Sequence, residues 1–101
     1  MSERIFSINK EKNRFELAVE GHIAFIEYIL AKGDVMYLTH TEVPDVLAGK
    51  GVGSEIVEKA LNYLKDHHYT LAPLCPFVAK YLTKHTDWKS ILAPGYHIQN
   101  S

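Results

Sequence analysis

The pattern of hydrophobic and polar positions changes period once along the chain, from the alternation of strands to the spacing of helices. Residues 13–19 alternate polar with apolar side chains, which is typical of a half-buried strand. Residues 1–12 become polar and charged after Ile8, and no strand is predicted there. The strand at 13–19 is therefore expected near an edge of a sheet.

Two further apolar segments predict two more strands. Residues 22–30 are apolar on both sides except at Glu27, as expected of a central strand that is covered on both faces. Residues 35–43 are rich in β-branched and aromatic side chains. Short turns that contain Gly21 and Gly33 separate these strands, so the pattern predicts an antiparallel meander of three strands.

From Gly51 onward the apolar positions follow a helical period. They form one stripe, while Glu55 and Lys59 make an i,i+4 pair on the other side of the predicted helix. The stripe consists of Val52, Ile56, Val57, Ala60, Leu61 and Leu64. We expect this helix to end near residues 66–68.

A shorter strand and a shorter helix follow. Residues 70–75 predict a strand that runs parallel to the strand at 35–43, because a helix joins the two. Pro76 suits the first turn of a helix over residues 77–85, and residues 87–94 predict one or two more helical turns. The sequence therefore predicts an α/β fold, in which an antiparallel β-meander is followed by a β-α-β unit with a parallel strand and a short C-terminal helix.

Composition narrows the classes of partner. The chain has 101 residues, of which 47% are hydrophobic, and this predicts a single domain over 1–101 with a core at about 13–94. A formal net charge of −1, without long runs of like charge, argues against nucleic acid and membrane surfaces as partners. The single cysteine, Cys75, excludes an internal disulfide, and together with the polar N-terminus it indicates a cytoplasmic protein. Both a monomer and a homodimer remain open.

Residues 41–54 connect the third predicted strand to the long helix through a loop that contains Gly49, Gly51 and Gly53. Glycines let a backbone approach a ligand closely, and the first N–H groups of a helix bind anions, so this loop predicts a phosphate site. Lys50 adds a cation at the same place. The spacing fits neither a Walker loop nor a dinucleotide fingerprint. A tight turn without any ligand is the alternative.

Three short motifs read Thr41-Glu42-Val43-Pro44, Gly49-Lys50-Gly51-Val52-Gly53 and Pro73-Leu74-Cys75-Pro76-Phe77. They resemble the motifs of one protein family, the minimal YjdJ-type family of the GNAT superfamily of N-acetyltransferases. The resemblance extends over about residues 13–94 and implies that acetyl-CoA is bound by Thr41, Val43, Gly49, Lys50, Gly51, Val52, Gly53 and Ser54. Ala48 stands where the superfamily pattern has Gln or Arg, which leaves phosphate recognition to backbone N–H groups and Lys50.

The resemblance also implies catalytic residues. Cys75 would lie near the reactive end of the cofactor, Tyr81 would protonate the departing thiolate, and Glu42 would act as general base. His40, two positions away on the same face, is a second candidate for the base. The structural alternatives are a small buried hydrophobe at Cys75 and a core residue at Tyr81. For Glu42 and His40, the alternative is a solvent-facing polar pair. The histidines do not form a convincing metal site.

The loop pattern taken with the resemblance implies an N-acetyltransferase that moves an acetyl group from acetyl-CoA to a primary amine, of a small molecule or a protein, by direct attack. Two alternatives remain open. One is a CoA-binding or interaction module without catalysis, and the other is acyl transfer through a covalent acyl-Cys75. The chain lacks the pair of helices that in the superfamily follow the first strand and help to form the acceptor site, so the sequence does not identify the amine.

Overall fold

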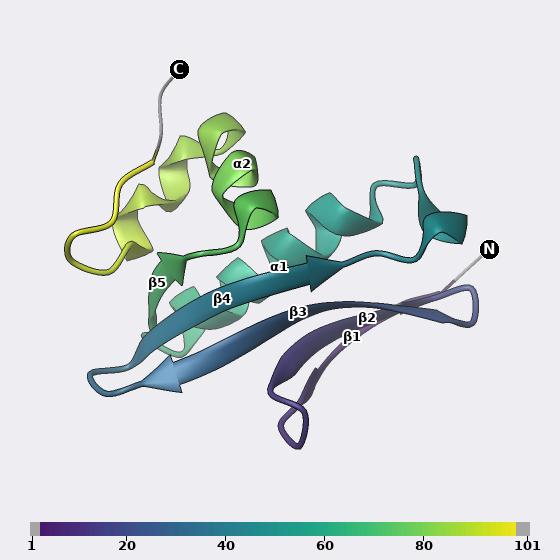
Figure 1. The fold of residues 1–101 in the computed structure, drawn as a ribbon, viewed down its shortest axis with the longest axis horizontal. Helices are drawn as coiled ribbons and strands as arrows, with labels where there is room; N and C mark the ends of the chain where they lie inside the picture. The colour runs from purple at the N-terminus through teal and green to yellow at the C-terminus, as the bar shows by residue number, and fades with distance from the viewer. Residues whose placement is uncertain (1–2, 99–101) are drawn as a thin grey trace.

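The structure, a computed structural model of the chain, describes residues 3–98. Among these residues one sheet contains five strands in the order β1-β2-β3-β4-β5. The strands are β1 (Arg4–Asn9), β2 (Arg14–Val19), β3 (His22–Ala31), β4 (Val35–Glu42) and β5 (Thr70–Pro73). Strands β1 to β4 pair antiparallel, and β4 pairs with β5 in parallel (Figure 1).

The helices all come after β4 in the chain. Helix α1 (Val52–Asp66) joins β4 to β5, and α2 (Pro76–Lys84) follows β5. Two 3₁₀-helices, η1 (Asp45–Leu47) and η2 (Thr86–Ile91), precede α1 and follow α2. This arrangement confirms the predicted meander, the β-α-β unit and the short C-terminal helix, although β5 ends at Pro73 rather than at Cys75.

Strand β1 corrects the prediction that the first twelve residues hold no strand. It pairs along its whole length with β2, from Arg4 opposite Val19 to Asn9 opposite Arg14. The meander therefore has four strands, and β2 lies inside the sheet rather than at its edge. The alternation in β1 is masked because Ile5 places an apolar side chain, 54% exposed, on the face of the sheet opposite the core.

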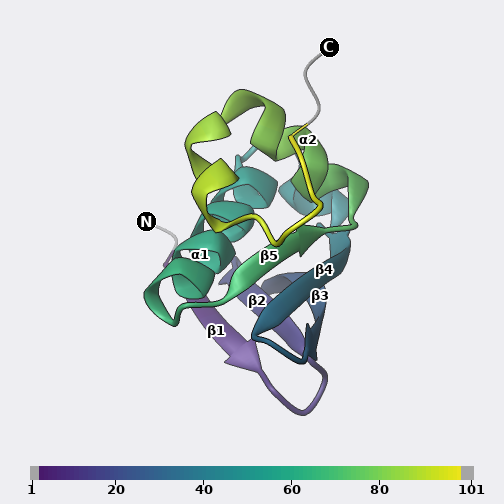
Figure 2. The same cartoon turned by 90° about the vertical axis from the view of Figure 1, so that its left-hand side faces the viewer.

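Strand β3 is central, as predicted, but only one of its faces is covered. Ala24 and Ile26 are buried, whereas Ile23 is 41% and Ile29 56% exposed on the other side. The covered face is the one against which α1 packs (Figure 2). A strand–helix–parallel strand connection is right-handed, so the crossover through α1 places this helix on one face only.

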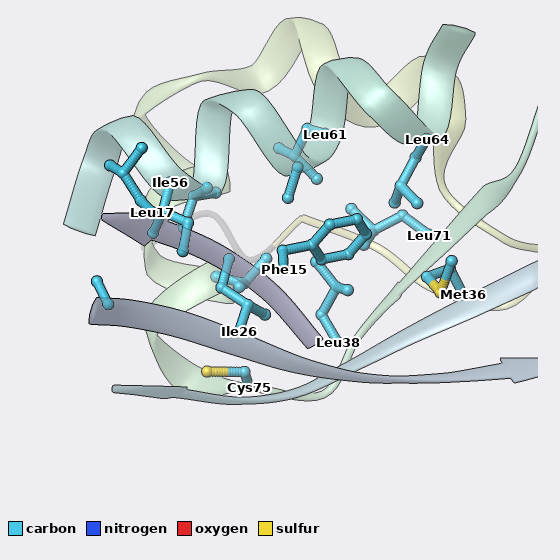
Figure 3. Close-up of a cluster of buried hydrophobic side chains, with 14 of the residues drawn as sticks. Phe15, Leu17, Ile26, Met36, Leu38, Ile56, Leu61, Leu64, Leu71 and Cys75 are labelled. Carbon is cyan, nitrogen blue, oxygen red and sulfur yellow. The ribbon is translucent and has the colours of Figure 1, made fainter. Parts of the chain in front are cut away.

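The core fills the space between α1 and the sheet. All six residues of the predicted helical stripe are buried, and they meet inward-facing side chains of the strands such as Phe15, Leu17, Ile26 and Leu38. Figure 3 shows Phe15 near the middle of this cluster, and Cys75 belongs to the same cluster. Burial of these apolar side chains is the main force that holds α1 on the sheet.

The two strands of the parallel pair differ in length, because β5 ends opposite Leu38 whereas β4 continues to Glu42. We call the region beside residues 39–42 of β4, where β5 is absent, the opening. Pairing with β5 runs from Val35 to Leu38, and the Cys75 N–H donates the next hydrogen bond to the Leu38 carbonyl at 2.8 Å. Beyond that point the chain turns into α2, whose first residue is Pro76. Within residues 3–98, the last part of β4 therefore has β3 on one side and no strand on the other.

The opening begins at a bulge in β4. Tyr28 lies opposite Leu38 and Glu27 lies opposite His40, so Thr39 is an extra residue without a partner on β3. A bulge bends a strand and increases its twist. It also shifts the alternation by one, so that His40 and Glu42 share the open face with Phe25, while Thr41 shares the covered face with Ile26.

Candidate functional site

A cleft of about 320 Å³ lies where β4 runs into the loop before α1. Its walls come from the end of β4, from η1, from the first turn of α1 and from one side chain of α2. The lining residues are Val43, Pro44, Asp45, Leu47, Ala48, Gly49, Gly51, Val52, Gly53, Ser54 and Phe77. Six of the eight predicted cofactor-binding residues are among them; Thr41 and Lys50 are not.

The backbone of the loop explains two of its three glycines. Gly49 has φ of 78° and Gly51 has φ of 73°, a left-handed conformation that side chains with a Cβ rarely adopt. Gly51 is also the N-cap of α1, and no side chain among residues 3–98 caps this terminus. The first N–H groups of α1, from Val52 to Ser54, therefore face the cleft without intrahelical partners, at the positive end of the helix dipole.

Gly53 is needed for a different reason from the one the sequence suggested. It lies in α1 with helical backbone, and a Cβ added to it would come within 2.5 Å of Cζ of Phe77. The ring of Phe77, 43% exposed, thus lies against the first turn of α1 and forms the wall of the cleft on the α2 side. The sequence placed Phe77 in a family motif but not in the site, because this contact joins two distant segments.

The ammonium group of Lys50 is held by another residue. Its Nζ donates to both carboxylate oxygens of Glu20, at 2.9 and 3.1 Å, in the turn between β2 and β3. Arg4 donates from its guanidinium to the Lys50 carbonyl at 3.0 Å and forms an ion pair with Glu55. These contacts fix the outer side of the loop, and they leave the cleft itself to backbone N–H groups.

Thr41 and Cys75 meet in the opening between β4 and α2. The Thr41 Oγ1 and Cys75 Sγ atoms are 3.2 Å apart, and either group can be the donor. Cys75 is only 3% exposed and serves as the N-cap residue of α2. The structure therefore brings the predicted Cys75 to the point where β4 and β5 separate, with its thiol buried and hydrogen-bonded.

Glu42 and His40 form a pair on the open face of the sheet. His40 Nε2 lies 2.9 Å from Glu42 Oε1, and the two side chains are 54% and 57% exposed. Because Thr41 points to the covered face, the pair and the Thr41–Cys75 contact lie on opposite sides of the same strand. A proton acceptor from this pair can reach the opening only from the open face.

Tyr81 lies in a groove between α1 and α2 rather than against Cys75. The groove, of about 420 Å³, is lined by Gly51, Ser54, Glu55, Glu58, Lys59, Tyr81 and His85. The ring of Tyr81 stacks on that of His85, with centroids 4.1 Å apart.

Burial, and secondarily the carboxylate of Glu58, raises the pKa of the Tyr81 phenol above its usual 10.0, while a hydrogen bond with Trp88 acts in the opposite direction. The phenol is therefore protonated at neutral pH. Gly51 and Ser54 belong to both this groove and the cleft.

The cleft fits the phosphate portion of an acyl-CoA. It offers the first N–H groups of α1 and two left-handed glycines, and it borders the end of β4 at Val43. Among residues 3–98 no group of three or more His, Cys, Asp or Glu is arranged to hold a metal ion. Nor is any helix in that range long and apolar enough to cross a membrane.

Comparison with known proteins agrees with this geometry. Residues 14–91 match a family of α/β acyl-group transferases, the family described as GCN5-related N-acetyl-transferase. The chain belongs to this family. A search of curated proteins found no match for the chain.

Proposed function

We propose that this protein is an acetyl-CoA-dependent N-acetyltransferase that transfers the acetyl group to a primary amine by direct attack. The observation that carries the proposal is the cleft at the start of α1, which opens between β4 and α2. Membership of the GCN5-related N-acetyltransferase family supports the reaction class. The minimal YjdJ-type family remains the finer assignment that the motifs favour.

The backbone around the cleft supplies the binding groups. N–H groups of Val52, Gly53 and Ser54 bind the pyrophosphate, and the left-handed turn at Gly49 and Gly51 lets the phosphates come close to the backbone. The end of β4, with Thr41 and Val43, borders the route of the pantetheine arm. Acetyl-CoA supplies the activated acetyl group.

The bulge in β4 provides a site for polarising the thioester carbonyl. Thr39 has no partner residue on β3 and lies where β4 and β5 separate. We assign its backbone N–H as a donor to the oxyanion that develops during the transfer. Donors that are fixed before the reaction stabilise such an anion without reorganisation.

Proton transfer is assigned to groups on both sides of the opening. Glu42, with His40 as its hydrogen-bond partner, accepts a proton from the amine on the open face. Tyr81, whose pKa is raised, is the proton donor for the leaving thiolate. The groove that holds Tyr81 shares Gly51 and Ser54 with the cleft.

Two observations bear on the alternatives. The Cys75 thiol is buried and hydrogen-bonded to the Thr41 hydroxyl. Both features make a covalent acyl-Cys75 less favourable than direct attack. Ala48, together with the Lys50–Glu20 ion pair, leaves the cleft without a cationic side chain, and this favours a CoA-binding module without catalysis as the second candidate.

We further propose a cytoplasmic location and a small-molecule or protein amine as acceptor, with the protein acting as a monomer or a homodimer.

A transfer assay separates these possibilities. The purified chain is incubated with acetyl-CoA and a panel of primary amines, and both free CoA and acetylated amine are quantified. Amine-dependent turnover that survives Cys75→Ala supports direct attack, and acetylated Cys75 found by mass spectrometry supports the covalent route. Binding of acetyl-CoA without turnover on any amine would support the module, and no binding would contradict all three.

A further inference from the structure

A second groove carries the surface of the cleft onto α2. It has a volume of about 190 Å³ and is lined by Ser54, Phe77, Lys80, Tyr81, Lys84 and His85. Ser54 and Phe77 also line the cleft at the start of α1. A ligand seated on the α1 terminus can therefore extend past the ring of Phe77 onto α2.

This second groove is positively charged. Lys80 and Lys84 are four positions apart in α2, so their side chains lie on one face of the helix, and both residues are exposed. Neither forms an ion pair with any residue in the range 3–98. None of the six lining residues is acidic, whereas the groove on the α1 side of Tyr81 contains Glu55 and Glu58.

The chemistry of CoA requires more than one phosphate site. CoA carries a pyrophosphate and, on its ribose, a separate 3′-phosphate. The helix N–H groups in the cleft are suited to the pyrophosphate, and the side chains there include no cation directed at a ligand. Lys80 and Lys84 lie on the continuous surface, and within residues 3–98 their ammonium groups form no ion pair. Such groups bind phosphate oxygens by charge-assisted hydrogen bonds.

We infer that Lys80 and Lys84 bind the 3′-phosphate of CoA and make the site selective for CoA over its 3′-dephospho form. This inference rests on the proposed function, because it assigns the nucleotide end of the same ligand. It also explains how a cleft without a side-chain cation can hold a polyanion: the cations are on α2, beyond Phe77.

The test compares CoA with 3′-dephospho-CoA by calorimetric titration of the full chain at low salt. We expect the parent protein to bind CoA about tenfold more tightly than 3′-dephospho-CoA, as two exposed charge-assisted contacts would give. The double variant Lys80→Gln/Lys84→Gln is expected to bind CoA as weakly as the parent binds 3′-dephospho-CoA. Its affinity for 3′-dephospho-CoA should be unchanged, which also shows that the variant is folded.

A charge-matched control is available on the same chain. Lys32 and Lys65 are exposed and line neither the cleft nor the groove on α2. The variant Lys32→Gln/Lys65→Gln removes the same charge and should keep the tenfold preference. Loss of the preference in this control would mean that net charge sets the preference, and would overturn the inference.

Other outcomes are equally decisive. If the parent binds CoA and 3′-dephospho-CoA with equal affinity, the inference is wrong while the proposed function stands. It is also wrong if the Lys80/Lys84 variant weakens both ligands by the same factor. If the parent binds neither ligand, the proposed function fails, and the inference fails with it.

Discussion

From Val35 to Leu38, strand β4 has a neighbouring strand on each side, whereas beyond the Thr39 bulge, from His40 to Glu42, it pairs with β3 alone. In the first half, Met36 and Leu38 are buried under the helices. In the second half, His40 and Glu42 are more than half exposed, and Thr41 touches Cys75 across the opening. The Thr39 bulge is the boundary between the halves.

The difference separates the part of β4 that stabilises the fold from the part that we propose binds the ligand. The closed half has its backbone groups in two ladders and its side chains in the core, so it contributes to the free energy of folding. Among the described residues the open half has no strand beside it on the β5 side, and we propose that this side receives the ligand. Changes in the closed half should therefore alter unfolding, and changes around the open half should alter binding and turnover.

The largest expected effect is on stability, from Leu38→Ala in the closed half. Leu38 is fully buried, and its truncation should lower the free energy of unfolding by about 3 kcal/mol. Thr39→Ala is the control in the open half, where only an exposed hydrogen bond to the Glu27 carbonyl is lost. Its expected cost is about 0.5 kcal/mol. Urea denaturation measures both, and equal costs would contradict the division of β4.

The next largest effect is on binding, from Gly51→Asp at the start of α1. A carboxylate there repels phosphates, and the left-handed backbone opposes any side chain, so acetyl-CoA should bind at least about 100-fold more weakly. Gly33→Asp is the matched control, because Gly33 also has a left-handed φ, of 78°, and open space around it. Calorimetry on both variants tests the prediction, and similar affinities would refute the cleft as the phosphate site.

A smaller effect is expected on turnover from Tyr81→Phe. Removal of the proton donor should lower kcat about 30-fold and leave the Kd for acetyl-CoA nearly unchanged. The raised pKa of the phenol implies that the parent keeps the protonated donor until the pH exceeds the usual value of 10.0, so the pH–rate profile should lose this dependence in the variant. Tyr96→Phe, outside both grooves, is the control. An unchanged kcat would assign Tyr81 a purely structural role.

Substitution of the polar pair on the open face should have a still smaller effect. Glu42→Gln and His40→Gln are each expected to reduce kcat about tenfold, since water can replace an exposed base in part. Because the two side chains are bonded at 2.9 Å, the double variant should be little worse than the worse single variant. Fully multiplicative losses in steady-state kinetics would show that they act independently.

The smallest effect concerns pH and lies outside the site. The hydrogen bond from Arg14, followed by that from Asn9, lowers the pKa of Glu16 below 4.5 against the opposing effect of burial. A lowered folded-state pKa stabilises the fold above the unfolded value and loses that stabilisation as the pH falls through the folded value. Glu16→Gln should flatten the acid limb of stability by less than about 1 kcal/mol. Thermal melts from pH 7 to pH 3 would reveal it, and an unchanged acid limb would argue against the ion pair.

The elements that could be predicted from the sequence are those whose signal is local. Helix α1 has six apolar residues at helical spacing, and all six are buried. The order of β2, β3 and β4 followed from two short glycine turns and one proline. Strand β1 was not predicted because its apolar residue Ile5 faces solvent, so apolar and polar positions do not alternate along it. Its pairing with β2, which the sequence of β1 does not contain, identifies it as a strand.

For the candidate site, too, only the features with a local signal could be predicted from the sequence. The glycines of the loop mark the left-handed turns at Gly49 and Gly51, which are properties of single residues. The contact of Phe77 with Gly53 and the ion pair of Lys50 with Glu20 join segments far apart in the chain, and no local pattern encodes them. The bulge at Thr39 depends on the register between two strands, which the sequence of one strand does not contain.

The central claim, that acetyl-CoA binds at the open end of β4, is tested most directly by a titration of the ¹⁵N-labelled chain followed by NMR. The account predicts that acetyl-CoA shifts the amide signals of Val43 and of residues 49–54, while those of Val35 to Leu38 remain in place. Shifts confined to other parts of the fold, or no shifts at saturating ligand, would contradict it.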